Sequence, residues 1–464
     1  MLQQIYSGIV TLSGWLWGIP ILTLLIVGGV ILTFVIGGIQ FTKLGFILKH
    51  TIGDLFNKEE QARKKSAGIT PFQSFTAALG ATVGTGNIVG VATAIAIGGP
   101  GALFWMWICG FLAMGIKFSE TVLSCHYREP RKNMSGYMAG PYMYIKIGLR
   151  CIPVATFFGV LKVIAPCLIS GVHGSSITSN LAKIGVTSEI TCIILVIFTG
   201  MVAIGGMKWL VKITDRMVPI MCGLYIIVAL IIIGLNIDKT GAVFSSIFHG
   251  AFSGWAAVGG FTGATLTATM RQGVARGVFS TDAGLGLQAM LHAQADVIDH
   301  PAQQGMWAVT ETFIDTIIIC TLSGLIVLYS GVWTTGGDSA TMVTIAMETS
   351  FGAIGQYGCV IALVLFGASS LIAGIQALYI QTVSMFDNKI LARIMQVIWI
   401  LVMLGGCLSN IKSAFVFADL INAIVLFINI PALVLLSKKL KTLTKEWFGN
   451  NGDLEKINQA RKAG

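Results

Sequence analysis

The feature that most constrains this chain is a series of long apolar runs, separated by short segments that carry nearly all of its charge. A bilayer core about 30 Å thick needs roughly 20 apolar helical residues to cross it. We therefore expect an all-α polytopic membrane protein whose partner is a lipid bilayer. Windows of this size predict eleven transmembrane helices, at 17–40, 72–97, 102–126, 152–180, 188–205, 217–236, 254–270, 304–330, 355–385, 391–410 and 413–436.

The composition agrees with a membrane environment. Only 11% of the 464 residues are charged, whereas soluble domains carry about 25%. The net charge of +10 is spread over short segments between apolar runs, so it does not form the single basic surface that nucleic-acid binding requires. The nine cysteines occur singly, without a CxxC pair, which argues against a metal or redox centre.

The positions of the basic residues predict the orientation, because cytoplasmic loops collect Lys and Arg. Alternate loops carry only Lys183, Lys239 and Lys412, while Lys117 and Lys162 lie inside predicted spans. The N-terminus is therefore expected outside and the C-terminus inside. The other 25 of the 30 basic residues lie in segments 41–70, 127–150, 207–216, 271–303, 386–394 and 437–464.

The predicted span at 72–97 contains a cluster of glycines, at 80, 84, 86 and 90. Glycine destabilises a helix by about 1 kcal/mol relative to alanine, and an unwound backbone at membrane depth is tolerated only where it lines a polar cavity. Its free N–H and C=O groups can then hold a carboxylate and a cation. Close helix packing through GxxxG spacings is the alternative explanation.

A second glycine-interrupted span at 254–270 favours the transporter interpretation, since paired broken helices mark a midplane binding site. The spans then divide into two inverted five-helix repeats, 72–236 and 254–436, within a single domain of residues 1–464. The helix at 17–40 stands outside the repeats. Residues 437–464 form a cytoplasmic tail.

Several motifs, distributed in order along nearly the whole chain, resemble the alanine/glycine:cation symporters of the amino acid-polyamine-organocation superfamily. They are GTGNIVGVATAI (84–95), GGPGALFWMWICGFLAMGIKFSE (98–120), GPYMYIKIGL (140–149), VPIMCGLY (218–225), RGVFSTDAGLG (276–286), DHPAQQG (299–305) and IDTIIICT (314–321). The resemblance implies a five-plus-five fold with broken first and sixth core helices. It also implies sodium-driven uptake of alanine, glycine or a somewhat larger relative across a bacterial plasma membrane.

The same resemblance implies where the coupling ion, Na⁺, would bind. Its ligands would be the carbonyls of Gly80 and Val83 and the hydroxyls of Ser369 and Ser370. Hydroxyl oxygens in the middle of an apolar helix suit a hard cation. The alternative is that each serine only caps a carbonyl of its own helix.

The resemblance also places the amino-acid substrate. Its carboxylate would lie on the backbone N–H groups of Thr85 and Gly86, with Asn87 nearby. Its amino group would meet carbonyls of the second broken helix. Those carbonyls would belong to Gly259, Gly260, Phe261 and Thr262.

The chain departs from the family pattern in three places near the expected pocket. His173 and Ser175 stand where the family has Gln and Asn, Gly374 lies in a segment that usually carries aromatic residues, and Asp282 replaces a Glu. A missing aromatic wall leaves space, and an imidazole adds a polar group. These changes predict a substrate larger than alanine, although His173 could equally be a packing residue.

Charged residues inside spans are functional candidates by default, because charge at membrane depth is costly. Lys117 and Glu120 are expected to pair near the cytoplasmic end of their span, in a structural role. Asp315 lies deeper, with Glu311 one turn earlier. A pair between Asp315 and Lys162 is conceivable from their depth, but spacing alone does not establish it.

Other functional classes fit the sequence less well. An enzyme is not expected, since the chain has neither HExxH nor GxSxG and its six histidines are dispersed. A proton-coupled amino-acid transporter of the same fold is the main alternative, and an ion channel a more distant one. The sequence leaves the exact substrate, the stoichiometry and the oligomeric state open, and a monomer is consistent with it.

Overall fold

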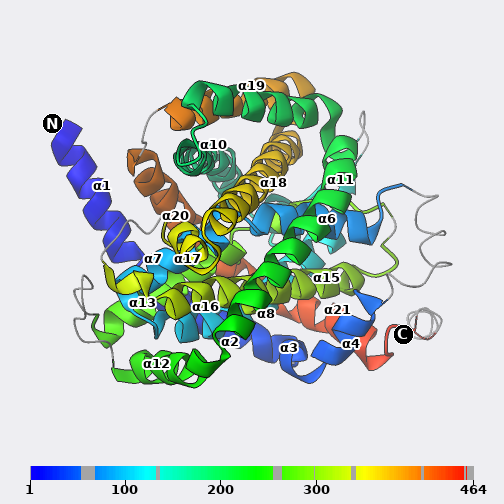
Figure 1. Ribbon diagram of the computed structural model, residues 1–464. Coiled ribbons are helices and arrows are strands. Elements are labelled where there is room, and N and C mark those ends of the chain that lie inside the picture. The colour runs from blue at the N-terminus through cyan, green and yellow to red at the C-terminus, as the bar shows by residue number, and fades with distance from the viewer. Residues whose placement is uncertain are drawn as a thin grey trace.

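A computed structural model describes residues 2–53, 68–131, 136–253, 264–296, 298–335, 341–408, 412–453 and 456 (Figure 1). The regular structure of the described chain is helical except for one hairpin with two strands of two residues each. This confirms the predicted all-α class. The elements are α1 (Leu2–Leu16), α2 (Ile19–Val35), α3 (Ile39–Thr42), α4 (Leu44–Lys49), α6 (Pro71–Thr82), η2 (Thr85–Asn87), α7 (Val89–Gly98), α8 (Ala102–His126), β1 (Glu129–Pro130), β2 (Tyr137–Met138), α9 (Pro141–Met143), η3 (Tyr144–Gly148), α10 (Ile152–Ala182), α11 (Ser188–Leu235), η4 (Ile237–Lys239), α12 (Thr240–Ser253), α13 (Leu266–Thr281), α14 (Leu287–His292), α15 (Pro301–Thr312), η5 (Phe313–Cys320), α16 (Thr321–Ser330), η6 (Val332–Thr335), α17 (Met342–Phe351), α18 (Ala353–Phe386), α19 (Lys389–Leu408), α20 (Lys412–Leu435) and α21 (Ser437–Gly449).

Eight helical segments among the described residues are long and apolar enough to cross a membrane, and one bent pair adds a ninth. The predicted spans 188–205 and 217–236 form one 48-residue element, α11, which is interrupted by the non-helical Gly206 (φ 66°, ψ −153°). The first span begins earlier than predicted, because Ser7–Val35 counts as one apolar unit. The short helices α12 and α17 were not expected, since neither is long enough to cross a bilayer.

The first broken helix lies where the glycine cluster predicted it. α6 starts at a capping box in which Thr70 and Gln73 bond each other's backbone N–H groups. It stops at Thr82 because Val83 and Gly84 are extended, and α7 then continues at an angle of 56°. Figure 1 shows α6 and α7 as separate helices.

The second broken helix is displaced from its predicted position. The predicted residues Gly259–Thr262 lie outside the described residues, and α13 begins only at Leu266. The interruption among the described residues is at 282–286, where Asp282, Gly284 and Gly286 all have positive φ and separate α13 from α14. The interrupted helix therefore extends over 266–292, and the prediction of a span at 254–270 is wrong in its boundaries.

Each half of the first broken helix packs against one half of the second. α7 packs against α13, and α6 packs against α14, while α8 contacts both α13 and α14. Beside them, α18 lies next to α10 and α6, and α19 covers α10 and α18 (Figure 1). Arg271 and Arg276, which the sequence analysis assigned to a cytoplasmic loop, lie within α13.

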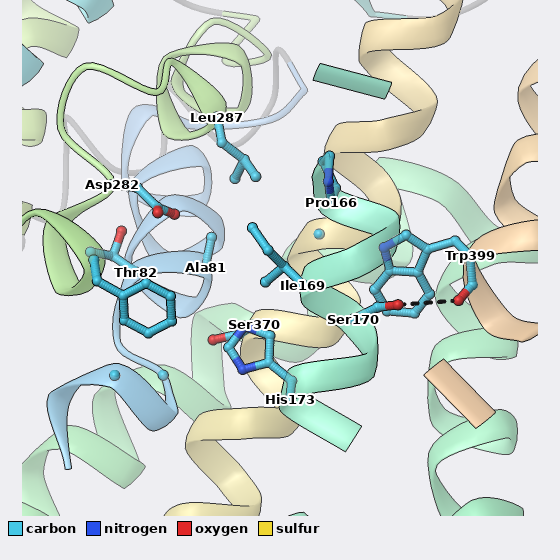
Figure 2. Close-up of a pocket in the computed structure, with 14 residues that line it drawn as sticks. Ala81, Thr82, Pro166, Ile169, Ser170, His173, Asp282, Leu287, Ser370 and Trp399 are labelled. Carbon is cyan, nitrogen blue, oxygen red and sulfur yellow. Dashed lines mark hydrogen bonds between the residues drawn. The ribbon is translucent and has the colours of Figure 1, made fainter. Parts of the chain in front are cut away.

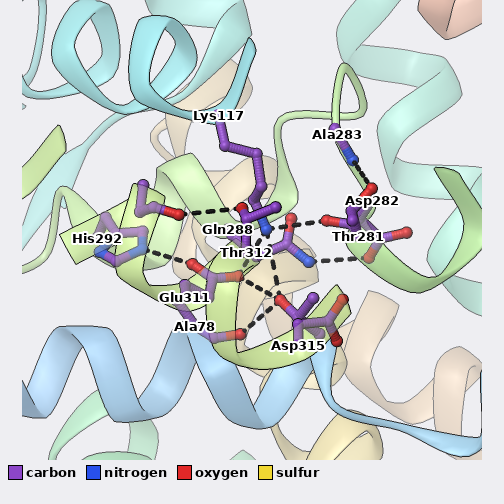
Figure 3. A network of polar contacts seen from close by, with 12 residues as sticks. Ala78, Lys117, Thr281, Asp282, Ala283, Gln288, His292, Glu311, Thr312 and Asp315 are labelled. Carbon is purple, nitrogen blue, oxygen red and sulfur yellow. Dashed lines mark hydrogen bonds and ion pairs between the residues drawn. The ribbon is translucent and has the colours of Figure 1, made fainter. Parts of the chain in front are cut away.

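A buried polar network joins these helices (Figure 3). The ammonium of Lys117 lies 2.6 Å from Glu311 Oε1 and donates to the carbonyl of Thr281 at 2.9 Å. His292 Nε2 lies 2.7 Å from the other oxygen of Glu311. Lys117 is only 1% exposed, so the predicted pairing of Lys117 with Glu120 at the cytoplasmic end is wrong. Instead, Glu120 accepts from Asn429 Nδ2 at 2.5 Å.

Replacing Glu311 should destabilise the fold strongly. Glu311→Ala leaves the ammonium of Lys117 buried without its carboxylate, and breaking a buried pair in this way costs about 3–5 kcal/mol. Thermal unfolding of the detergent-solubilised protein measures the effect. Glu446→Ala is the control, because this carboxylate is 30% exposed and 3.5 Å from His300, so its loss should cost about 0–1 kcal/mol. Equal changes in melting temperature would contradict the assignment.

Candidate functional site

A cavity of about 50 Å³ lies between the two helix breaks (Figure 2). Both breaks contribute to its wall, together with α10, α18 and α19. A site in this position fits the general rule that broken helices of transporters surround the binding site. The lining residues are Ala81, Thr82, Gly84, Gly86, Pro166, Ile169, Ser170, His173, Phe279, Asp282, Leu287, Ser370, Gly374 and Trp399.

The four expected sodium ligands lie together where α18 meets the first break, and Ser370 among them lines the cavity. Ser369 Oγ lies 3.4 Å from the carbonyl oxygen of Val83, and Ser370 Oγ lies 3.4 Å from that of Gly80. The Gly80 carbonyl lacks its usual helical donor, because the N–H of Gly84 is bonded to Asn87 Oδ1 at 2.9 Å. Four oxygens from two helices therefore converge, as binding of a hard cation requires.

The alternative role of the two serines is also present. Both hydroxyls donate to the carbonyl of Phe366, at 2.8 Å from Ser369 and 3.1 Å from Ser370. A hydroxyl that donates its proton in this way keeps two lone pairs. Helix capping and cation binding therefore do not exclude each other here, and capping orients the oxygens toward the first break.

The expected carboxylate site lies in η2, the single turn directly before α7. The backbone N–H groups of Thr85 and Gly86 have no hydrogen-bond partner among the described residues. Unpaired N–H groups at a helix N-terminus form a ready anion site. A Cβ atom at Gly86 would lie 3.1 Å from the ring of Phe279, so a larger residue at this position would crowd the anion site.

Of the other predicted substrate residues, some line the cavity and others do not. His173 and Gly374 line the cavity, and His173 Nδ1 lies 3.1 Å from the hydroxyl of Thr85. Ser175 does not line it. The side chain of Asn87 points away, because its Nδ2 donates to Asp315 Oδ1 at 2.6 Å.

Trp399 and Asp282 are among the lining residues to which the sequence analysis gave no role in the site. Trp399 of α19 lies beside Gly374, where an added Cβ would be 3.6 Å from Trp399 Cζ2, so α19 supplies the aromatic wall that the family pattern places on α18. Asp282 lies on the second break (Figure 2). The altered loop motif and its glycines Gly284 and Gly286 were the available sequence signal for this break.

Asp315 connects the two breaks. It accepts hydrogen bonds from Asn87 of the first break and from Ser280 at the end of α13, at 2.6 and 3.0 Å. It lies in the π-helical segment η5 and is fully buried, and such segments often occur at functional sites. The conceivable pair with Lys162 is not formed. Lys162 is buried and is instead electrostatically coupled to Asp282 and Glu120.

Comparisons with known proteins agree with this geometry. Residues 2–460 match the model of the sodium:alanine symporter family. The chain is 39% identical to an uncharacterized transporter, YflA, of Bacillus subtilis, over 96% of this chain and 94% of the relative. It is 34% identical to the sodium/alanine symporter AgcS of Methanococcus maripaludis (94% and 95% covered). It is 32% identical to the probable sodium/glutamine symporter GlnT of Bacillus subtilis (96% and 91%).

Solved structures share the fold at low sequence identity. The crystal structure of MhsT in complex with L-phenylalanine matches with a TM-score of 0.56 at 14% identity, over 80% of this chain and 97% of that one. A manganese transporter of Eremococcus coleocola matches with a TM-score of 0.50 at 13% identity (85% and 90%). These similarities confirm the predicted sodium-symporter fold.

Removing the Asp315 carboxylate should loosen the first break. Asp315→Ala deprives Asn87 and Ser280 of their acceptor, and a hydrogen bond to a charged group contributes about 1.5–3 kcal/mol. Amide hydrogen exchange in the peptide covering residues 80–90 should accelerate by roughly tenfold or more. Asp238→Ala, at an exposed position in η4, should leave the exchange unchanged. Identical exchange in both variants would show that Asp315 does not hold the break.

Proposed function

Because the chain belongs to the sodium:alanine symporter family, we propose that it carries a neutral amino acid into the cell together with Na⁺. The observation that supports this best is the meeting of the Gly80 and Val83 carbonyls with the Ser369 and Ser370 hydroxyls, directly beside two unpaired N–H groups. The protein would act as a multi-pass carrier of a bacterial plasma membrane. Its N-terminus would be outside.

The cavity offers complementary charges to a zwitterion. The substrate carboxylate would lie on the N–H groups of Thr85 and Gly86, where the start of α7 favours negative charge. The ammonium would face the carboxylate of Asp282 at the end of α13, where the helix terminus favours positive charge. This position replaces the carbonyls of Gly259–Thr262 as the proposed amino-group site.

Ion and substrate would support each other through the backbone. The carbonyl of Val83 precedes the N–H of Thr85 by two residues, so the cation and the substrate carboxylate lie on the same unwound segment. Their attraction strengthens where water is excluded. Bound sodium therefore raises the affinity for the amino acid, and by linkage the amino acid raises the affinity for sodium.

A second, larger cavity offers a route to the side of the membrane where the basic loops lie. It measures about 640 Å³ and extends from the start of α6 to α11 and α19. Lys208, Lys212 and Arg393 lie on its wall, and Gln376 of α18 places it close to the substrate cavity. We propose that the amino acid leaves through this vestibule.

Removing both serine hydroxyls should weaken sodium binding. Ser369→Ala with Ser370→Ala deletes two of the four proposed oxygen ligands, so the sodium concentration for half-maximal uptake should rise by about tenfold or more. Uptake into proteoliposomes at varied sodium concentration measures this. Thr382→Ala is a matched control on the same helix, since its hydroxyl bonds the carbonyl of Leu378. Unchanged sodium dependence in the double variant would contradict the proposed sodium site. So would uptake that is as fast with a proton gradient alone as with sodium.

Neutralising Asp282 should reduce recognition of the amino group. Loss of a charged hydrogen bond costs about 1.5–3 kcal/mol, which lowers affinity by about tenfold to a hundredfold. Asp282→Asn should therefore bind alanine more weakly, while binding of lactate, which has a hydroxyl instead of the ammonium, changes little. Asp282→Glu keeps the charge and should keep the preference for alanine. An unchanged ratio of alanine to lactate binding in Asp282→Asn would place the ammonium elsewhere.

A further inference from the structure

The indole of Trp399 has an unusual position in the substrate cavity. The residue is 1% exposed, and its Nε1–H has no hydrogen-bond partner among the described residues. A tryptophan N–H can only donate, and buried donors without an acceptor are rare in folded proteins. Other buried polar atoms of the described chain also lack partners, but the residues that carry them do not line this cavity.

Gly374 gives the cavity access to this donor. An added Cβ at Gly374 would lie 3.6 Å from Cζ2, which belongs to the edge of the indole that also carries the N–H. Because Gly374 has no side chain, this edge faces the cavity, and Figure 2 shows the indole nitrogen on the side toward Pro166. Ser170 fixes the position from the opposite helix, since its hydroxyl donates to the carbonyl of Trp399 at 3.3 Å.

The charge of the wall limits what the acceptor can be. Asp282 is a carboxylate on the same cavity, and no Lys or Arg is among the described residues that line it. A second carboxylate on the substrate side chain would find no Lys or Arg on the described part of this wall, and burying a charge without a partner is costly. Besides Ser170 and His173, the wall on the α10 side of the cavity is formed by the apolar residues Pro166 and Ile169. An uncharged acceptor on a short carbon chain therefore fits best.

We propose that Trp399 is a specificity-determining residue. Its indole N–H donates a hydrogen bond to an uncharged oxygen of the substrate side chain, which belongs to either a carboxamide or a hydroxyl. The inference rests on the proposed amino-acid transport and specifies its substrate as a neutral polar amino acid. A site built around such a donor discriminates strongly against analogues that lack the acceptor, because the donor then stays unpaired.

Competition experiments on the full-length protein test this inference. Sodium-driven uptake of labelled alanine in proteoliposomes is competed with serine, threonine, asparagine, glutamine, glutamate and leucine. Trp399→Phe removes the N–H and keeps an aromatic ring. Trp447→Phe is the matched control, because this indole in α21 is also buried without a partner but does not line the cavity.

The wild type should bind one polar pair, serine and threonine or asparagine and glutamine, at least about tenfold more tightly than leucine and glutamate. The pair that binds identifies the acceptor as hydroxyl or carboxamide. Trp399→Phe should weaken binding of the polar pair at least about tenfold more than binding of alanine, whereas Trp447→Phe should keep the polar preference. Alanine uptake without a polar preference, or equal losses for alanine and the polar pair in Trp399→Phe, would overturn the inference. Absence of any sodium-driven uptake in the wild type would instead refute the proposed function.

Discussion

The structure depends on how unpaired backbone groups are accommodated at membrane depth. Hydrocarbon offers no hydrogen bonds, and each unsatisfied backbone group there costs several kcal/mol. At the first break, helical bonding stops at Thr82, so the carbonyls of Gly80 and Val83 and the N–H groups of Thr85 and Gly86 lose their usual partners. These groups can be stable only beside polar atoms. The serine hydroxyls of α18 lie 3.4 Å from the carbonyl oxygens of Val83 and Gly80, and Gly86 lines the cavity.

Side chains from other helices hold the break in this shape. The side-chain oxygen of Asn87 accepts a hydrogen bond from the N–H of Gly84, and its side-chain nitrogen donates one to Asp315. Asp315 also receives the hydroxyl of Ser280, so one carboxylate controls the distance between the two breaks. Nearby, Lys117 and Glu311 join α8 to α15, and Glu311 also accepts the hydroxyl of Thr82. Lys117, Glu311 and Asp315 therefore each have a partner on a different helix.

The sequence predicted those parts of the site that follow from local composition. The glycines of 80–90 located the first break. Ser369 and Ser370 were assigned from the family resemblance, which their position as hydroxyls in an apolar helix supported. The break at 282–286 was missed, because Arg271 and Arg276 made α13 resemble a loop. The partner of Lys117 was also missed, since Glu120 is near in sequence whereas Glu311 is near only after folding. Spacing along one helix indicates which residues are neighbours on that helix. It does not indicate which residues of other helices pack against them.

The position of Asn87 gives a physical reason why the proposed ion and substrate sites would depend on each other. Its oxygen accepts from the N–H of Gly84, which leaves the Gly80 carbonyl without its helical donor, and the next two N–H groups, of Thr85 and Gly86, have no hydrogen-bond partner among the described residues. A single side chain thus sets the geometry on both sides of Val83. If the segment moved when sodium left, the N–H groups of Thr85 and Gly86 would move with it, since only two peptide units separate them from the Val83 carbonyl. Coupling between the two sites would then need no long pathway, because both would be formed by the same few residues of unwound backbone.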